Sequence, residues 1–224
     1  MPWFAARGWE CHAVSLRGHG GSPNPSSLRR TRIRHYAGDL TEVIDSLPVP
    51  PIVVAHSMGA LVAQRALEGR RLPGLVLVAP VPLGGVWRTT LRVIRRHPWK
   101  FLKANLTLNL WPIVEDRTVA ARLLLEPDTP VEVVDAVWRR LQPESYLAYL
   151  DMLLFVRARP ALVPTPVRLV AAGEDRLFAV GDARRTAQAY GVEPVVVEGA
   201  AHDMMLGSSW EAAAAAVEGA LESL

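Results

Sequence analysis

The chain has 224 residues, half of them hydrophobic, and a formal net charge of +3 at pH 7. This size and composition fit one globular domain with a sizeable core, and the basic residues form no stripe interleaved with aromatics, which argues against nucleic-acid binding. Cys11 is the only cysteine, so disulfides within the chain are excluded and a reducing compartment is favoured. The N-terminus lacks the apolar core of a signal peptide, and no apolar run is long enough to span a bilayer. We therefore expect a cytoplasmic protein without stable membrane insertion.

Five short apolar runs predict strands. In chain order they are CHAVSL from Cys11, PIVVA from Pro51, LVLVA from Leu75, VRLVAA from Val167 and PVVVE from Pro194. Each run is nearly continuous rather than alternating, which is typical of strands buried on both faces of a parallel sheet. Helix-like segments follow at 61–69, at 181–191 and at the C-terminus, where SSWE predicts a helix capped by Ser208 with Glu211 bonding back. The alternation predicts an α/β fold, a mostly parallel sheet flanked by helices.

The region from 81 to 160 breaks this rhythm. It contains no clear buried strand, but apolar residues recur at helical spacing between frequent prolines. The repeating positions are Trp87, Leu91 and Ile94, then Val134, Val137 or Trp138, and Leu141, then Tyr146, Leu150 and Leu153. We interpret this region as a helical lid inserted between the third and fourth predicted strands. It divides the chain into a first core part (1–80), the lid (81–160) and a second core part (161–224).

The first part of the predicted lid is strongly basic. Between Val81 and Val114 there is no Asp or Glu, and the basic residues there are Arg88, Arg92, Arg95, Arg96, Lys100 and Lys103. Their helical spacing opposite the first apolar stripe is typical of a solvated face. The alternative is a weak interfacial contact, in which this segment is attracted to anionic surfaces or acyl substrates.

The stretch AHSMG, residues 55–59, places Ser57 at a turn between a predicted strand and a helix. A serine there is commonly an N-cap, and as a nucleophile it needs a base and an acid. His202 follows the last predicted strand and is the candidate base. Asp175 follows the fourth and is the candidate acid, with Glu174 as the alternative. Because loops at the carboxyl ends of parallel strands meet at one crevice, we expect the three side chains to lie together.

These motifs and their order resemble the α/β-hydrolase family. AHSMG is similar to the family's G-x-S-x-G elbow, SLRGHGGS to the turn after its fourth strand, and GED and AHD to its acid and base loops. The resemblance implies that Ser57 is the nucleophile, His202 the general base and Asp175 the orienting acid, with the backbone N–H of Met58 as an oxyanion donor. The residues agree, because Met58 opens a predicted helix whose first N–H groups are unpaired. No cofactor is implied, and no residue cluster has metal-ligand spacing.

Two features depart from the family. Ala55 stands where the elbow normally begins with Gly, so we expect a slightly adjusted turn. The family also opens with strands and an HG loop that supplies a second oxyanion donor, whereas MPWFAARGW resembles the tail of the first helix. We expect a truncated chain of weak activity, with a gap between the CHAVSL and PIVVA strands. The alternative is that these two strands pair directly.

The resemblance implies a serine hydrolase that cleaves a small or medium acyl ester, such as a monoacylglycerol-like or lysophospholipid-like substrate. Thioester hydrolysis and perhydrolysis use the same triad and are not distinguished by the sequence, which also leaves the oligomeric state open. The alternative is a non-catalytic remnant, or a binding module, with an incomplete oxyanion hole.

Overall fold

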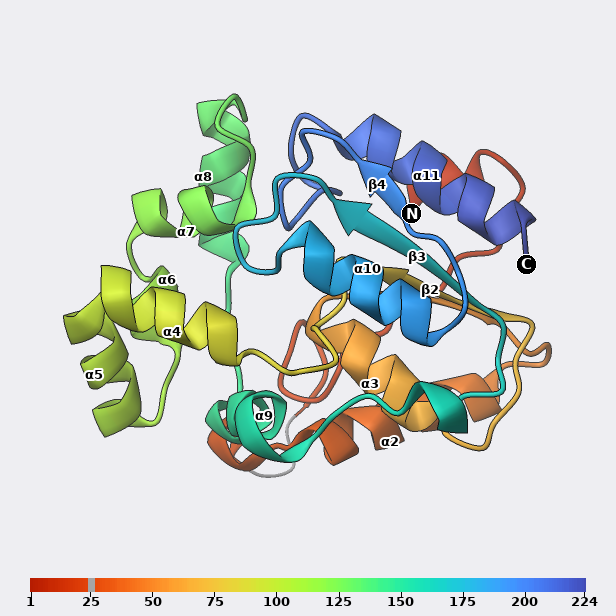
Figure 1. Cartoon of the computed structure of the whole chain (residues 1–224), viewed down its shortest axis with the longest axis horizontal. Helices are drawn as coiled ribbons and strands as arrows, with labels where there is room; N and C mark the ends of the chain where they lie inside the picture. Colours follow the sequence, from red (N-terminus) through yellow and green to blue (C-terminus); the bar gives the residue numbers. More distant parts are fainter. Residues whose placement is uncertain (24–26) are drawn as a thin grey trace.

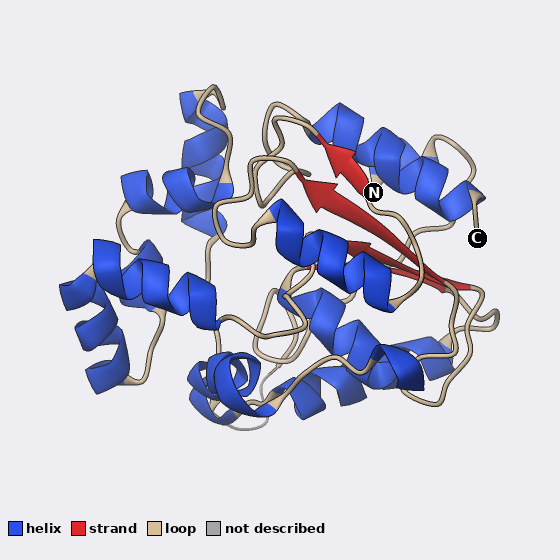
Figure 2. Ribbon diagram, viewed as in Figure 1, coloured by secondary structure: helices blue, strands red, loops and turns tan. Residues whose placement is uncertain are grey.

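A computed structural model describes residues 1–23 and 27–224. In these residues the sheet has four parallel strands, in the spatial order β1-β2-β3-β4. The strands are β1 (Ile52–His56), β2 (Gly74–Val78), β3 (Val167–Ala172) and β4 (Val195–Val197). All of them point toward the side of the molecule on which α4 to α8 lie (Figure 2). The prediction of a parallel sheet flanked by helices is confirmed.

Helices make up most of the remaining structure. Before β2 they are α1 (Pro2–Ala5), α2 (Ile33–Ser46) and α3 (Met58–Ala66). Between β2 and β3 they are α4 (Trp87–Arg96), α5 (Pro98–Thr107), α6 (Trp111–Val114), α7 (Arg117–Leu124), α8 (Val131–Arg140) and α9 (Tyr146–Leu150). After β3 they are α10 (Val180–Ala189) and α11 (Trp210–Glu222). Short helical turns of other types occur at Leu28–Arg30, Asp151–Phe155 and Pro160–Leu162.

The sheet is buried between two layers of helices (Figure 1). On one face, alternate strand residues such as Leu75 and Leu169 pack with α2, α3 and α10. On the other face, Val76 and Val170 pack with α11. Every residue of β2 is buried, which explains why its sequence is continuously apolar. This packing fixes the strand ends from which the candidate site is built.

The predicted strand at 11–16 is wrong. These residues form no strand, and His12, Ala13, Val14 and Ser15 are exposed. An apolar cavity of about 540 Å³ lies between this segment and β1, so the segment has no backbone partner there. The alternative that it pairs directly with β1 is therefore also wrong. Without a neighbouring strand, apolar composition alone does not form a strand.

The predicted cap of the last helix is wrong as well. The N-cap residue of α11 is Ser209, and its side chain makes no capping hydrogen bond. The Ser208 hydroxyl instead donates to Asp128 Oδ1 at 2.9 Å, in the segment between α7 and α8. A tertiary contact has thus replaced the local one.

The surface of α4 carries an apolar stripe that the core does not cover. Trp87, Leu91 and Ile94 are 49%, 40% and 36% exposed, whereas Thr90 and Val93 are buried. Among the described residues, none of the helices combines the length and apolar character that a bilayer crossing requires.

Candidate active site

Ser57 occupies the single position between β1 and α3. Its φ is +52° and its ψ is −120°, a conformation that residues other than glycine rarely adopt. Two hydrogen bonds fix this turn: the Ser57 N–H donates to the Val78 carbonyl at 3.0 Å, and the Ser57 carbonyl accepts from the Val81 N–H at 3.3 Å. Ala55 is 7% exposed within β1, so the sheet accommodates its methyl group where the resemblance expects glycine.

The side chains of Ser57, His202 and Asp175 are joined by two hydrogen bonds. Ser57 Oγ lies 2.8 Å from His202 Nε2, and His202 Nδ1 lies 2.7 Å from Asp175 Oδ2. The His202 and Asp175 side chains are each 3% exposed. Because an ionised carboxylate can only accept, Nδ1 carries the proton and Nε2 accepts from the serine hydroxyl. The structure thus brings together the three residues selected from the sequence, in an arrangement that can deprotonate a serine.

Asp175 is held by its own loop, which follows β3. Its Oδ1 accepts from the N–H groups of Leu177 and Phe178, at 2.7 and 2.9 Å, which leaves Oδ2 for His202. The Phe178 ring packs edge-on against the imidazole of His202, with centroids 5.1 Å apart. Glu174, the alternative acid, is exposed. Of the two candidates, Asp175 is the one that contacts the imidazole.

Met58 is the first residue of α3 and directly follows Ser57. The first N–H groups of a helix lack acceptors within the helix, and the helix dipole makes this end positive. An oxygen that becomes negatively charged beside the Ser57 side chain would be stabilised there. The position of Met58 at the start of α3 agrees with this expectation, and its role as an oxyanion donor stays a prediction.

His56, the residue before Ser57, contacts the backbone of the loop that carries His202. The alternation of side chains along a strand does not predict this contact. Its Nε2 donates to the His202 carbonyl at 3.0 Å, and the two rings lie 4.8 Å apart. Burial, together with the positive charge that His202 can acquire, lowers the pKa of His56 to about 3. His56 is therefore neutral near pH 7 and acts as a hydrogen-bond donor to the loop.

His56, His202 and Asp203 offer ligand atoms within 4.8 Å of one another. A metal ion there would have to displace the hydrogen bonds from His56 to the His202 carbonyl and from Ser57 to His202 Nε2. Burial raises the pKa of Asp203, so this carboxyl holds its proton more tightly than a free one. We therefore assign no metal to these residues.

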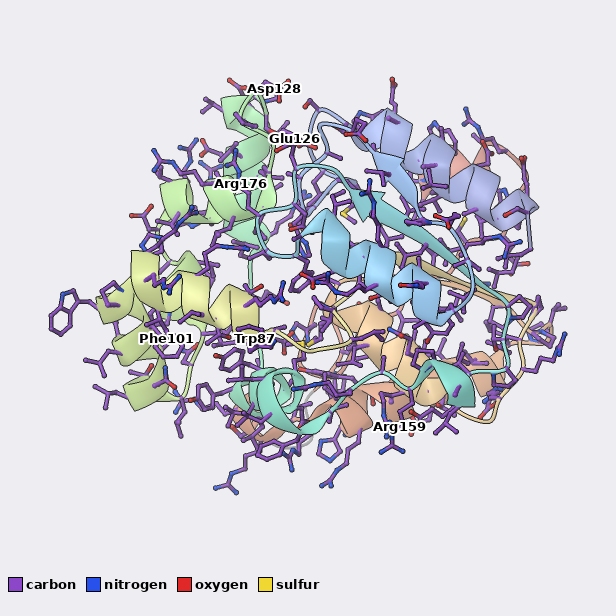
Figure 3. All side chains as sticks on the ribbon, in the orientation of Figure 1. Trp87, Phe101, Glu126, Asp128, Arg159 and Arg176 are labelled. Atoms are coloured by element: carbon purple, nitrogen blue, oxygen red, sulfur yellow. The ribbon has the colours of Figure 1, made fainter. Side chains whose placement is uncertain are left out.

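The segment 124–128, between α7 and α8, holds the backbone on both sides of His202. The Ala201 N–H donates to Glu126 Oε1 at 3.1 Å, and the Asp203 N–H donates to the Leu124 carbonyl at 2.9 Å. Glu126 is only 5% exposed, and a Cβ on Gly207 would overlap its carboxylate. Figure 3 shows Glu126 where this segment meets the loops after β3 and β4. Sequence reasoning missed Glu126, whose only signal is an acidic residue directly after an apolar run.

Helix α4 holds the Asp175 loop in a similar way. Arg92 Nη1 and the Thr89 hydroxyl donate to carbonyl groups of Arg176 and Leu177. The region between β2 and β3 therefore contacts the loops of both the candidate base and the candidate acid.

His19, in the predicted Gly-rich turn, lies apart from these hydrogen bonds. Its Nε2 is 3.3 Å from Glu144 Oε2, and its Nδ1 is 3.2 Å from the Arg17 carbonyl. The Glu144 carboxylate raises the pKa of His19. These contacts tie the turn to the segment before α9, as expected of a structural histidine.

Comparisons with known proteins give one family and many structures of the same fold. The sequence model of the alpha/beta hydrolase family matches residues 1–217. A non-heme bromoperoxidase from Mycobacterium tuberculosis is similar in structure with a TM-score of 0.77 and 19% identity, over 99% of this chain and 84% of the other. A methylesterase from Arabidopsis has a TM-score of 0.68 and 18% identity, over 100% of this chain and 91% of the other. A monoacylglycerol lipase from Paleococcus ferrophilus has a TM-score of 0.61 and 19% identity, over 92% of this chain and 81% of the other. A search of curated protein sequences finds no match.

Proposed function

Because the chain belongs to the α/β-hydrolase family, we propose that it is a serine hydrolase that cleaves a carboxylic ester through an acyl-enzyme. The observation that carries this proposal is the pair of hydrogen bonds from Ser57 through His202 to Asp175. Such a chain of contacts lets the imidazole accept the serine proton while the carboxylate stabilises the resulting imidazolium.

In the proposed reaction, Ser57 Oγ attacks the ester carbonyl as His202 Nε2 takes its proton. The carbonyl oxygen becomes negative and is stabilised by the Met58 N–H. His202 then protonates the departing alkoxide, which leaves the acyl group on Ser57. A water molecule, deprotonated by His202, attacks the carbonyl of the acyl-enzyme. The acyl–Oγ bond then breaks, the carboxylic acid is released, and His202 returns the proton to Ser57 Oγ. No step requires a cofactor, because the nucleophile, base and acid are all side chains of this chain.

The proposed substrates are small or medium acyl esters of monoacylglycerol-like or lysophospholipid-like chemistry. The similarity to proteins described as a monoacylglycerol lipase and a methylesterase supports esters as the substrate class. The exposed apolar stripe of α4 supports a substrate with an acyl chain. Thioester hydrolysis and perhydrolysis use the same residues and are separated by assay.

The proposal is tested by the turnover of p-nitrophenyl esters of increasing acyl length. Ser57→Ala should lose at least about 1,000-fold in turnover, because the nucleophile is gone while binding contacts remain. Ser46→Ala, an exposed serine at the end of α2, is the matched control and should match wild type.

Turnover by Ser57→Ala within a few-fold of wild type would refute the serine mechanism. If the wild type hydrolyses no ester or thioester, the alternative of a non-catalytic binding module is favoured instead.

A further inference from the structure

A cavity of about 330 Å³ lies between α4, α7 and the Asp175 loop, and five of the ten described residues that line it are basic. Its basic lining residues are Arg92, Arg96, His97, Arg122 and Arg176. The described lining residues include no Asp or Glu. Arg176 lies on the side of the core that faces α7 and α8 (Figure 3). The volume of the cavity falls at the lower end of the range of about 300–1,000 Å³ that small-molecule pockets occupy.

Within residues 1–23 and 27–224, no Asp or Glu side chain forms an ion pair with these arginines. The Arg92 side chain donates to the backbone carbonyls of Arg176 and Leu177. The Arg176 side chain donates to the backbone carbonyl of Arg122 at 2.8 Å. Carbonyl acceptors leave the guanidinium charge uncompensated. The side chains of Arg96 and Arg122 make no hydrogen bond or ion pair with any residue that the structure describes.

Asp116, at the start of α7, is an acidic group on which Arg122 acts. Its Oδ1 accepts from the Val119 N–H at 3.0 Å, and this bond, together with the charges of Lys100 and Arg122, lowers its pKa. Asp116 is committed to capping the helix and does not line the cavity. The four positively charged arginines around the cavity repel one another, so an anion that enters the cavity is attracted by all four.

We propose that this cavity binds a phosphate group, either as free phosphate or as part of a phosphate ester. A phosphate group is well suited to binding by several guanidinium groups, because each guanidinium presents paired N–H donors to the phosphate oxygens. A carboxylate carries one charge and two oxygens and would leave most of these donors unused. The stripe of Trp87, Leu91 and Ile94 on the same helix is also exposed, so the phosphate of a lipid headgroup and free phosphate are the two sources that the experiment separates. Phosphate binding does not depend on the proposed function.

Titration calorimetry of the whole chain with inorganic phosphate at low ionic strength tests the site. Wild type should bind with a dissociation constant in the millimolar range or below, and the double variant Arg96→Gln/Arg122→Gln should lose about tenfold or more in affinity. Arg184→Gln removes an exposed arginine of α10 and should bind as wild type does. Arg96→Lys/Arg122→Lys keeps the charge and should retain more affinity than the Gln pair, provided that circular dichroism shows both folded.

Absence of binding by folded wild type, or equal affinity in the Gln pair, would overturn the proposal. Co-sedimentation with phosphatidylcholine vesicles, with and without phosphatidylglycerol, identifies the source. Binding to the anionic vesicles alone, lost in the Gln pair, indicates a headgroup phosphate. A calorimetric signal without co-sedimentation indicates free phosphate. Esterase activity enters neither measurement, so failure here leaves the proposed hydrolase untouched.

Discussion

At the residue scale, each group of the candidate triad is fixed by backbone contacts of its own. The turn at Ser57 is held by Val78 and Val81, and Asp175 is held by two N–H groups of its loop. His202 receives a hydrogen bond on its carbonyl from His56. Because each of these residues is also held by backbone hydrogen bonds, a single substitution in the candidate triad should change chemistry more than folding.

Asp175→Asn should lower turnover about 10³- to 10⁴-fold, because an amide can donate to His202 Nδ1 and thus favour the wrong tautomer. Glu174→Gln is the matched control: the neighbouring acid is exposed and should keep turnover near wild type. Steady-state kinetics with a p-nitrophenyl ester checks both variants. Greater damage from the Glu174 substitution would mean that the acid is misassigned.

The contact among Ser57, His202 and Asp175 could be predicted from the sequence, because a candidate triad requires particular residue types after particular strands. His56 and Glu126 could not. Their contacts are with the backbone of a loop far away in sequence, at Ala201 and His202, and a backbone acceptor or donor leaves no pattern in the sequence.

At the element scale, the segment 124–128 is the main contact between the region of α4 to α9 and the base loop. Glu126→Ala should lower kcat about 10- to 100-fold with little change in KM for a short ester, because the loop of His202 loses its anchor and shifts. Glu126→Gln keeps an acceptor for the Ala201 N–H and should restore most of the rate. Asp128→Ala removes the exposed contact to Ser208 and serves as the control.

Kinetics and melting temperature together decide this prediction. A kcat of Glu126→Ala equal to wild type would show that the segment does not position His202. Equal losses in the Gln and Ala variants would show that the charge of Glu126 matters, rather than its hydrogen bond.

Two glycines test the helix assignments. Gly38 lies inside α2, and a Cβ there would meet no atom within 4 Å. Gly38→Ala should therefore raise the free energy of unfolding by about 0.5–1 kcal/mol. Gly191, after α10, has a φ of +67°, so Gly191→Ala should destabilise by about 1–2 kcal/mol. Urea denaturation measures both, and an equal sign for the two changes would contradict the assigned backbone conformations.

Strand positions could largely be predicted, because β2 is buried at every residue and β3 at every residue except Arg168, so both strands are almost entirely apolar. The strand at 11–16 was predicted wrongly for a physical reason. Pairing needs a neighbouring backbone edge, and a cavity separates this segment from β1. Apolar composition does not supply that edge, and most of this segment is exposed. The cap at Ser208 failed because the contact with Asp128 replaces it.

At the scale of the whole molecule, His56 links the stability of the fold to pH. Its pKa of about 3 in the folded protein lies below the ordinary value of 6.5. Between these two values the unfolded chain binds a proton that the folded chain does not, so the free energy of unfolding falls as pH is lowered. One proton contributes a slope of about 1.4 kcal/mol per pH unit. His19, whose pKa is raised, acts in the opposite direction: its contribution is present at low pH and is lost as pH rises through its folded pKa.

Urea denaturation at several pH values, with wild type and His56→Gln, isolates this effect. The difference in unfolding free energy between the two proteins should shift in favour of the variant as pH falls below 6.5, since other titrating groups contribute equally to both. His19→Gln should shift the difference the other way. A pH-independent difference for His56→Gln would show that folding does not lower the pKa of His56.

The central claim is that Ser57 is an activated nucleophile in this chain. The most direct test is the reaction of the native protein with a fluorophosphonate probe, followed by mass analysis of its peptides. We expect one adduct, on the peptide containing Ser57, formed by native protein, absent in Ser57→Ala and strongly slowed in His202→Ala. A native protein that forms no adduct, or forms it on another serine, would contradict the assignment.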